Sequence, residues 1–171
     1  GHYQIARTPR KNEIVGLLPT FLVAMDLSWW IEKHNRHHAN PNVLGEGADL
    51  EISVLAFTEE QALSKNILLG PIVRYQAFLF YPIFMLSSFS LRFGGVAYLV
   101  RGRDVKYRVL EPLLMVTHAV IYLSVLYYLL GPWQGVLFLV IHQSVAGLFM
   151  GGTFAPNHKG MPVMEKGSVP D

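Results

Sequence analysis

The chain contains 171 residues, of which 51% are hydrophobic and 15% are charged, and its formal net charge at pH 7 is +2. This composition is typical of a protein partly surrounded by lipid, so we expect a membrane protein. The charge is small and the basic residues gather in short connecting segments, which argues against a nucleic-acid partner. Cysteine is absent. Disulfides and cysteine-ligated iron–sulfur clusters are therefore excluded, and a bound metal has to use histidine and carboxylate ligands.

The first apolar region covers residues 14 to 31 and nearly reaches the length of a membrane span. Pro19 and Asp26 interrupt it, which favours a segment that lies in the membrane interface without crossing. Trp29 and Trp30 stand near its end. Tryptophans at such a position are typical of interfacial anchors, and contact with a bound substrate is the alternative interpretation.

Three histidines follow within five positions, in the sequence "HNRHH" of residues 34 to 38. In an α-helix the positions i, i+3 and i+4 share one face, so His34, His37 and His38 are expected to direct their rings towards a common centre. Neutral imidazole suits iron, zinc and copper, and three such ligands leave coordination positions that other segments must fill. The alternative is a solvated polar turn that binds no metal.

Polar residues and turn signals dominate from position 39 to 66. Thr58 followed by Gln61 resembles the capping box that opens a short helix. Asp49 is a candidate to accept a hydrogen bond from a metal-bound imidazole, although a solvated loop residue is the simpler interpretation. The next apolar region, residues 67 to 100, is broken by charged residues, proline and glycine, and its uninterrupted core from 77 to 86 is too short to cross a bilayer.

Two cleaner apolar segments, 113 to 130 and 135 to 155, each approach the roughly 20 residues that a spanning helix needs. The uncharged "GPW" of residues 131 to 133 separates them, so we predict a transmembrane hairpin. The basic sequence "RGRDVKYR" precedes the hairpin and two lysines follow it, which predicts that both of its ends are cytoplasmic. We interpret His118 and His142, near the middle of each segment, as packing residues, with a functional role in the membrane as the alternative.

Four segments in order resemble the membrane-bound fatty acid desaturases, in particular the bacterial acyl-lipid or acyl-CoA type related to front-end desaturases. They are "GHYQI", "WW" followed by "HNRHHANPN", "RYQAFLFYP" and "FAPNHKGMP". The resemblance covers essentially the whole chain. It implies an all-α membrane protein, in which a transmembrane hairpin and interfacial helices form part of four transmembrane helices beneath a cytoplasmic cap that carries the histidine boxes.

The resemblance also implies a diiron (Fe) centre held by three histidine boxes. His2 resembles the last histidine of the first box; the second box corresponds to His34, His37 and His38; and His158 resembles an additional histidine after the last transmembrane helix. Asn157 would be a water-linked neighbour of one iron. A third box of the form [HQ]xxHH is absent. We therefore expect residues 1–171 to be a partial desaturase domain, unable alone to hold a complete diiron site.

For the full-length protein the resemblance implies oxygen-dependent desaturation of a fatty acyl chain, carried as acyl-CoA or acyl-lipid. The partners would be O2, membrane lipid and an electron donor such as ferredoxin, rubredoxin or a cytochrome with its reductase. The basic residues between 101 and 108 would assist docking of that donor or simply set the topology. A multi-pass protein of the bacterial inner membrane is expected, with the histidine boxes on the cytoplasmic side. A diiron hydroxylase or ketolase, or a non-enzymatic metal-binding or transport protein, are the alternatives.

Membrane topology restricts this ligand assignment. If His2 and His34 bind one cluster, the chain between them crosses the membrane an even number of times, and two crossings need roughly 40 residues plus a turn. Only 31 residues lie between them, so the first apolar region should not cross. From His38 to His158 the hairpin supplies two crossings, provided that residues 67 to 100 supply none.

Overall fold

The structure is a computed structural model that describes residues 4–45, 50, 52–102, 104–154, 163 and 164. Within these residues the secondary structure is helical apart from one isolated parallel bridge between Val43 and Met164. The all-α prediction is therefore confirmed for this part of the chain. In order, the helices are α1 (Pro9–Gly16), α2 (Leu18–Val23), α3 (Leu27–Ala39), α4 (Glu59–Leu63), α5 (Gly70–Arg74), α6 (Gln76–Met85), α7 (Ser87–Arg101) and α8 (Leu110–Phe154).

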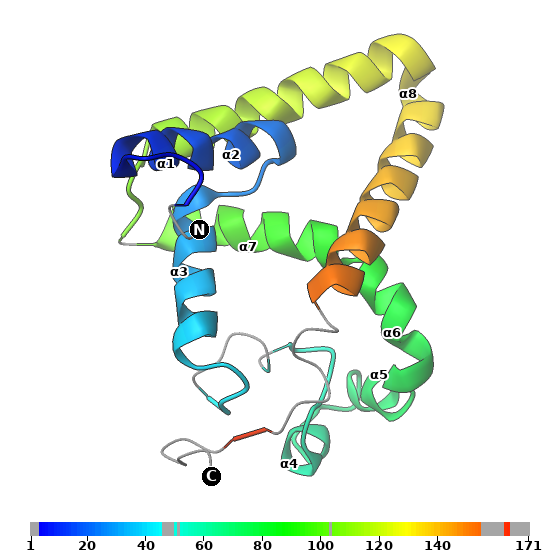
Figure 1. Cartoon of the computed structure of the whole chain (residues 1–171). Coiled ribbons are helices and arrows are strands. Elements are labelled where there is room, and N and C mark those ends of the chain that lie inside the picture. The colour runs from blue at the N-terminus through cyan, green and yellow to red at the C-terminus, as the bar shows by residue number, and fades with distance from the viewer. Residues whose placement is uncertain (1–3, 46–49, 51, 103, 155–162, 165–171) are drawn as a thin grey trace.

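Helix α8 consists of two apolar arms that meet at a sharp bend (Figure 1). The bend occurs at Gly131, whose φ of 73° and ψ of 177° are not helical. A backbone with this combination of angles is essentially restricted to glycine. Pro132 follows at the start of the second arm, where the fixed φ of proline is compatible with a first helical turn. The predicted break between two apolar segments is thus confirmed.

Helices α6 and α7 pack against α8, and α7 also contacts α3. At the crossing of α6 with the second arm of α8, the backbones approach closely because two glycines face the end of α6. A Cβ atom on Gly147 would lie 2.6 Å from the carbonyl oxygens of Phe84 and Met85, and one on Gly151 would lie 2.5 Å from the Phe84 ring. Small residues that allow such an approach are typical of helix contacts within membranes.

Among the described residues, one helix, Leu110–Thr153, is long and apolar enough to cross a membrane. The number rises to as many as three if each of two bent helix pairs forms one span. These pairs are Pro9–Val23 with Leu27–Ala39, bent by 110°, and Gln76–Met85 with Ser87–Arg101, bent by 63°. The first apolar region is therefore not one continuous helix, and its last residues begin the separate helix α3. The left-handed backbone of Ala24, with a φ of 52°, ends α2 before this bend.

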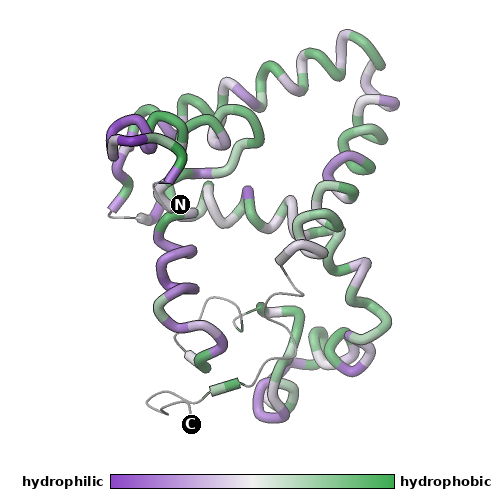
Figure 2. Tube along the Cα trace, in the orientation of Figure 1, coloured by the Kyte–Doolittle hydropathy of each residue, from purple (hydrophilic) through white to green (hydrophobic). Residues whose placement is uncertain are grey.

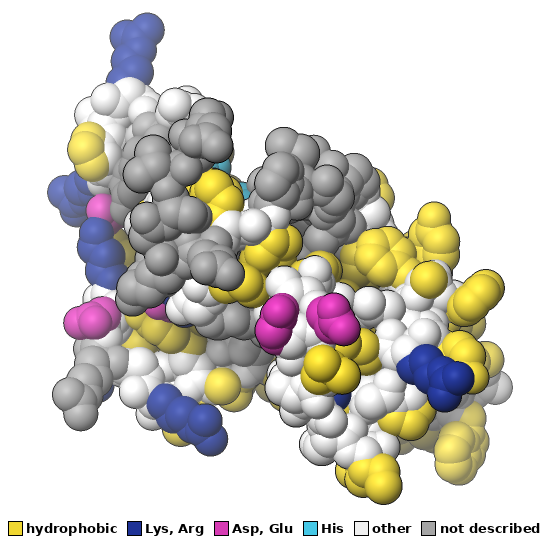
Figure 3. Space-filling model, turned by 90° about the horizontal axis from the view of Figure 1, so that it is seen from below, with side chains coloured by type: hydrophobic (Ala, Val, Ile, Leu, Met, Phe, Trp, Pro, Cys, Tyr) yellow, Lys and Arg dark blue, Asp and Glu magenta, His cyan; other side chains and the backbone are white. Residues whose placement is uncertain are grey.

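The histidine-bearing end of α3 lies at the same end of the molecule as α4 and α5 (Figure 1). Figure 2 shows that this half of α3 is hydrophilic, whereas both arms of α8 and most of α6 are hydrophobic. In the view from below, hydrophobic side chains gather on the right, the side on which α5 and α6 lie in Figure 1 (Figure 3). The molecule thus has an apolar surface over its hydrophobic helices and a polar region around the end of α3.

Candidate metal centre

Helix α3 places the three histidines of the "HNRHH" sequence on its last turns. Asp26 caps the beginning of the helix, because its carboxylate accepts a hydrogen bond from the Trp29 backbone N–H at 2.5 Å. The helix then continues without a break to Ala39. The prediction that His34, His37 and His38 occupy a helix is confirmed, and two of them are half-buried while His38 is exposed.

His34 and His38, four positions apart, bring their Nε2 atoms to 3.2 Å from each other. Their rings lie edge to face, with centroids 4.5 Å apart. Two imidazole nitrogens bound to one metal at about 2.0–2.1 Å are separated by about 3.0–3.4 Å when the angle at the metal is roughly 90–110°. The pair therefore fits two ligands of a single metal ion. A hydrogen bond between the two rings suits the same separation.

His37 does not join this pair around one point. Its ring centroid lies 5.2 Å from that of His38 and 6.4 Å from that of His34. No group of three or more histidine, cysteine or acidic side chains in the described ranges is arranged to hold a metal ion. On a helix, residues i and i+4 stack almost directly, whereas residue i+3 is displaced to the side. The common centre expected for all three rings is therefore reduced to a close pair with one neighbour.

The two tryptophans that precede the histidines are half-buried and contact other side chains of the protein. The ring of Trp30 stacks on that of His34, with centroids 5.5 Å apart and an interplanar angle of 19°. Trp29 packs against α7, where a Cβ atom on Gly94 would lie 2.7 Å from its ring. Lys33 places its ammonium 5.0 Å from the Trp29 ring centroid. These contacts orient the histidine-bearing face of α3 relative to α7.

The segment that follows α3 is joined to the far end of the chain. Leu44 N–H donates to the Met164 carbonyl and Met164 N–H donates to the Asn42 carbonyl, both at 2.9 Å. Met164 lies ten residues beyond the end of α8 at Phe154. The bridge therefore brings chain from beyond the apolar arms next to the segment that leaves the histidine helix.

Two glutamine side chains hold the polar segment between α3 and α6. Gln76 forms a pair of hydrogen bonds with the Ala56 backbone, accepting from its N–H at 3.0 Å and donating to its carbonyl at 2.9 Å. Gln61 accepts from Phe57 N–H at 2.8 Å and donates to the Leu50 carbonyl at 3.1 Å. The predicted cap is also confirmed, since Thr58 Oγ accepts from Gln61 N–H at 3.2 Å. These two hydrogen bonds give Gln76, one residue of the "RYQAFLFYP" segment, a structural role.

Four predicted site residues lie outside the described residues: His2, Asp49, Asn157 and His158. The same holds for Arg103 in the basic segment.

Another member of that segment, Lys106, pairs with Glu13 of α1 at 2.5 Å. Glu13 also accepts a hydrogen bond from the Tyr107 hydroxyl at 2.6 Å, and the hydrogen bonds from Lys106 and Tyr107 lower its pKa.

Sequence reasoning missed a buried polar contact at the start of α3. Both Glu111, in the first turn of α8, and Ser28, in the first turn of α3, are buried. Glu111 accepts from the Ser28 N–H at 2.9 Å and from the Ser28 hydroxyl at 2.6 Å. The available signal was a lone acid in the first turn of a long apolar helix, where the helix dipole favours a negative charge. Its contact with α3, 83 positions earlier, leaves no local pattern.

His118 and His142 connect the two arms of α8 through Tyr122. The Tyr122 hydroxyl lies 2.7 Å from His142 Nδ1, and the His118 ring stacks on that of Tyr122 with centroids 5.7 Å apart. These contacts agree with the packing role expected for both histidines.

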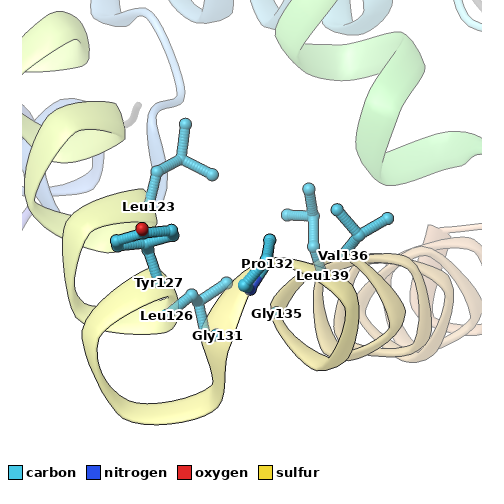
Figure 4. A pocket seen from close by; sticks show the side chains of 8 residues that line it. All are labelled: Leu123, Leu126, Tyr127, Gly131, Pro132, Gly135, Val136 and Leu139. Carbon is cyan, nitrogen blue, oxygen red and sulfur yellow. The ribbon is translucent and has the colours of Figure 1, made fainter.

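A cavity of about 260 Å³ lies in the bend between the arms, lined by Leu123, Leu126, Tyr127, Gly131, Pro132, Gly135, Val136 and Leu139 (Figure 4). Its largely apolar lining includes none of the histidines.

Comparison with known proteins covers nearly the entire chain. A family model described as "Fatty acid desaturase" matches residues 1–170. The chain is 28% identical over 174 residues to the acyl-lipid (9-3)-desaturase of Physcomitrium patens, which covers 95% of this chain and 33% of that protein. It is 28% identical over 171 residues to a Delta(6)-fatty-acid desaturase of Caenorhabditis elegans, covering 92% and 38% respectively.

A second plant relative, the acyl-lipid (9-3)-desaturase of Borago officinalis, is 26% identical over 162 residues, or 86% of this chain and 36% of the relative. The chain thus spans roughly a third of the length of these relatives. No solved structure matches it. The match over residues 1–170, together with the paired histidines at the polar end of an apolar helical protein, identifies the chain as a member of the fatty acid desaturase family.

Proposed function

We propose that the full-length protein is an oxygen-dependent fatty acyl desaturase that uses a histidine-ligated diiron centre. The observation that carries this proposal is the approach of His34 Nε2 and His38 Nε2 to 3.2 Å on one face of α3, in a chain of the desaturase family. Histidine is a suitable ligand for iron. When bound, the two irons would supply the chemistry that uses O2 and two electrons to convert two adjacent methylene groups into a cis double bond.

The histidines on α3 would divide between two metal ions. His34 and His38 suit one iron, while the lateral position of His37 suits a second, because the ions of two-metal sites lie about 3.5–4 Å apart. His2 and His158 would complete the coordination, with Asn157 and Asp49 as hydrogen-bonding neighbours. Trp30 would keep the His34 ring in place by stacking on it. The stacked Trp30 would limit rotation of the His34 ring before metal binds, so that less conformational entropy is lost on binding.

The β-bridge supports a contribution from His158. Met164 is bonded to the segment that leaves α3, and it follows His158 by six residues, a reach of at most about 20 Å. The end of α8 at Phe154 lies four residues before this histidine. Chain that follows His158 is thus bonded to the segment that leaves the histidine helix, which supports the proposed role of His158.

The substrate and the membrane arrangement are proposed on chemical grounds. Apolar arms with mostly exposed side chains suit contact with lipid and with an acyl chain, either as acyl-CoA or acyl-lipid. We infer a multi-pass arrangement with the histidines on the cytoplasmic side, and the basic residues that flank α8 support that orientation. The named relatives are eukaryotic, and bacterial origin stays a prediction from the resemblance. The electron donor, a ferredoxin, rubredoxin or cytochrome, would dock on the same side.

Substitution of His37 in the full-length protein tests this function. In a host that lacks the activity, the His37→Ala variant should reach the membrane but produce no new double bond in the lipids. His118→Ala is a matched control, because it also removes an imidazole but lies on α8 and outside the proposed ligand set. Its product should persist. Retained desaturation in His37→Ala would contradict the ligand assignment.

Metal content and product structure separate the alternatives. Two irons per full-length chain, together with an olefinic product, support the desaturase. An alcohol product with the same iron content would indicate a hydroxylase or ketolase. Stoichiometric zinc without iron, and no change in the acyl chains, would indicate a metal-binding or transport protein.

A further inference from the structure

The start of the histidine helix is held by a buried acidic pair, Asp26 and Glu111. Both residues have no exposed surface. Glu111 accepts three hydrogen bonds: from the Ser28 N–H and hydroxyl, described above, and from the Tyr107 N–H at 3.2 Å. It lies at the amino-terminal turn of α8 and faces that of α3, where two helix dipoles favour a negative charge. Every hydrogen bond that the structure gives Glu111 thus uses its carboxyl oxygens as acceptors.

Asp26 lies in a different environment. One carboxyl oxygen accepts from the Trp29 N–H at 2.5 Å, whereas the other, Oδ2, is buried and has no donor. Leaving a buried charged oxygen without a donor is costly. A proton on Asp26 removes this cost in two ways. It neutralises the carboxyl group, and it gives Asp26 a hydrogen to donate to the neighbouring Glu111 carboxylate.

We propose that Asp26 and Glu111 share one proton at neutral pH and act as positioning residues, which hold the first turn of α3, and with it the histidine cluster, against the start of α8. Ser28 completes the connection, since its hydroxyl donates to Glu111 and accepts from the Lys106 N–H at 3.0 Å. The shared proton does not depend on the proposed function. Its consequence for metal binding and desaturation rests on that function.

The surroundings of the pair favour the protonated form of Asp26. Burial is the largest cause that raises the pKa of Asp26, to about 7, and its hydrogen bond with Glu111 is the next. Both carboxyl groups lie within electrostatic range of Tyr98 of α7, and so do Glu32 of α3 and Asp104 of the connection between α7 and α8. None of these supplies a positive charge that would favour a second carboxylate. Lys106, the nearby base, is paired with Glu13 instead.

Packing from α7 covers Asp26. A Cβ atom on Gly95 would lie 3.0 Å from the Asp26 Cβ, so the helix backbone rests directly against this residue. The histidines begin eight positions after Asp26 on the same continuous helix. A shift of the first turn would therefore be carried along α3 to the metal ligands.

The direction of the pH dependence follows from the raised pKa. Because the folded protein favours protonated Asp26, the associated stability is fully present below the ordinary pKa of 3.8 and is lost as the pH rises towards 7. Asn at position 26 keeps the neutral form at every pH and can still donate to Glu111. Asp26→Asn should consequently gain stability relative to the native protein as the pH increases from about 4 to 7, with a constant difference at higher pH.

Infrared spectroscopy of the purified full-length protein tests the shared proton without any measurement of desaturation. The native protein should show a protonated-carboxyl stretching band at pH 6 that disappears on titration through about pH 7. Asp26→Asn should lack this band. The matched control Asp104→Asn, which replaces an exposed acid, should retain it. A native spectrum in which Asp26→Asn removes no such band would overturn the proposal.

The positioning role is tested by pH profiles of thermal unfolding and of desaturase activity. In Asp26→Asn, both profiles should lose the decline that the native protein and Asp104→Asn show as the pH rises towards 7. Identical profiles in the two variants would refute the positioning role. If no variant of the full-length protein desaturates lipids, the proposed function fails, while the infrared band and the unfolding profile still decide the proton.

Discussion

Helix α3 and the second arm of α8 are held in place by opposite means. Buried hydrogen bonds fix the start of α3, through the contact of Ser28 with Glu111. The second arm of α8 is instead fixed against α6 by the absence of side chains at Gly147 and Gly151. Within lipid, apolar burial gives little net attraction between helices, so close backbone packing takes its place. Where helices end in polar residues, a directional hydrogen bond can orient one helix against another, as Glu111 orients α3.

Removal of Glu111 should have the largest effect, because it breaks the polar contact completely. Glu111→Ala leaves the Ser28 N–H and hydroxyl buried without their acceptor. We expect a loss of about 3 kcal/mol in the free energy of unfolding, measured by denaturant or thermal unfolding of the full-length protein. Hydrogen exchange at the start of α3 should rise with it. Slow exchange there in Glu111→Ala would show that the helix is held by something else.

A methyl group at Gly147 should break the second kind of contact. Its Cβ would lie 2.6 Å from two backbone carbonyl oxygens of α6, so Gly147→Ala forces the helices apart at a cost of about 1–3 kcal/mol. Gly152→Ala is the matched control five positions away, where no atom lies within 4 Å of the added Cβ. Unfolding temperatures of the two variants in detergent provide the measurement. Equal temperatures would mean that this crossing is loosely packed.

The bend between the arms of α8 should respond to substitution of Gly131. With φ at 73° and ψ at 177°, alanine is strained by about 1–3 kcal/mol. Gly135→Ala serves as the comparison, because its added Cβ would be 3.5 Å from the nearest atom, an ordinary contact. Thermal unfolding should rank Gly131→Ala below Gly135→Ala. The reverse order would contradict the conformation at the bend.

A smaller effect is expected where a single polar side chain supports the segment between α3 and α6. Gln76→Ala removes both hydrogen bonds to the Ala56 backbone, which should cost about 1–2 kcal/mol. Limited proteolysis should cut the segment from 50 to 57 faster in this variant. Gln134→Ala, on the exposed surface of α8, should leave the rate unchanged.

The ion pair between Lys106 and Glu13 should matter least, since Lys106 is half exposed and surface pairs contribute little. The hydrogen bonds of Glu13 lower its pKa, so its stabilising effect is present above its ordinary pKa of 4.5 and is lost as the pH falls below that value. Lys106→Met should reduce this loss at acidic pH. An unfolding profile between pH 3 and 6 that matches the native one would exclude a contribution from the pair.

Local and periodic features of this fold could be predicted from the sequence. The break at Gly131 and Pro132, the cap at Thr58 and the helical position of the histidines each depend on residues only a few positions apart. The contact of Ser28 with Glu111 could not be predicted, because its partners are 83 positions apart and neither belongs to a motif. The spacing of the three histidines predicts a shared helix face, whereas the 3.2 Å approach of His34 and His38 depends on side-chain rotamers that spacing does not fix.

The bridge between Val43 and Met164 joins positions that are about 120 residues apart in the chain. During synthesis, the histidine helix α3 is made long before Met164, the residue that forms the bridge with Val43. Both arms of α8 must be synthesised before Met164 can reach this partner. The order of synthesis therefore makes this bridge a late contact, which closes only after both apolar arms have been made.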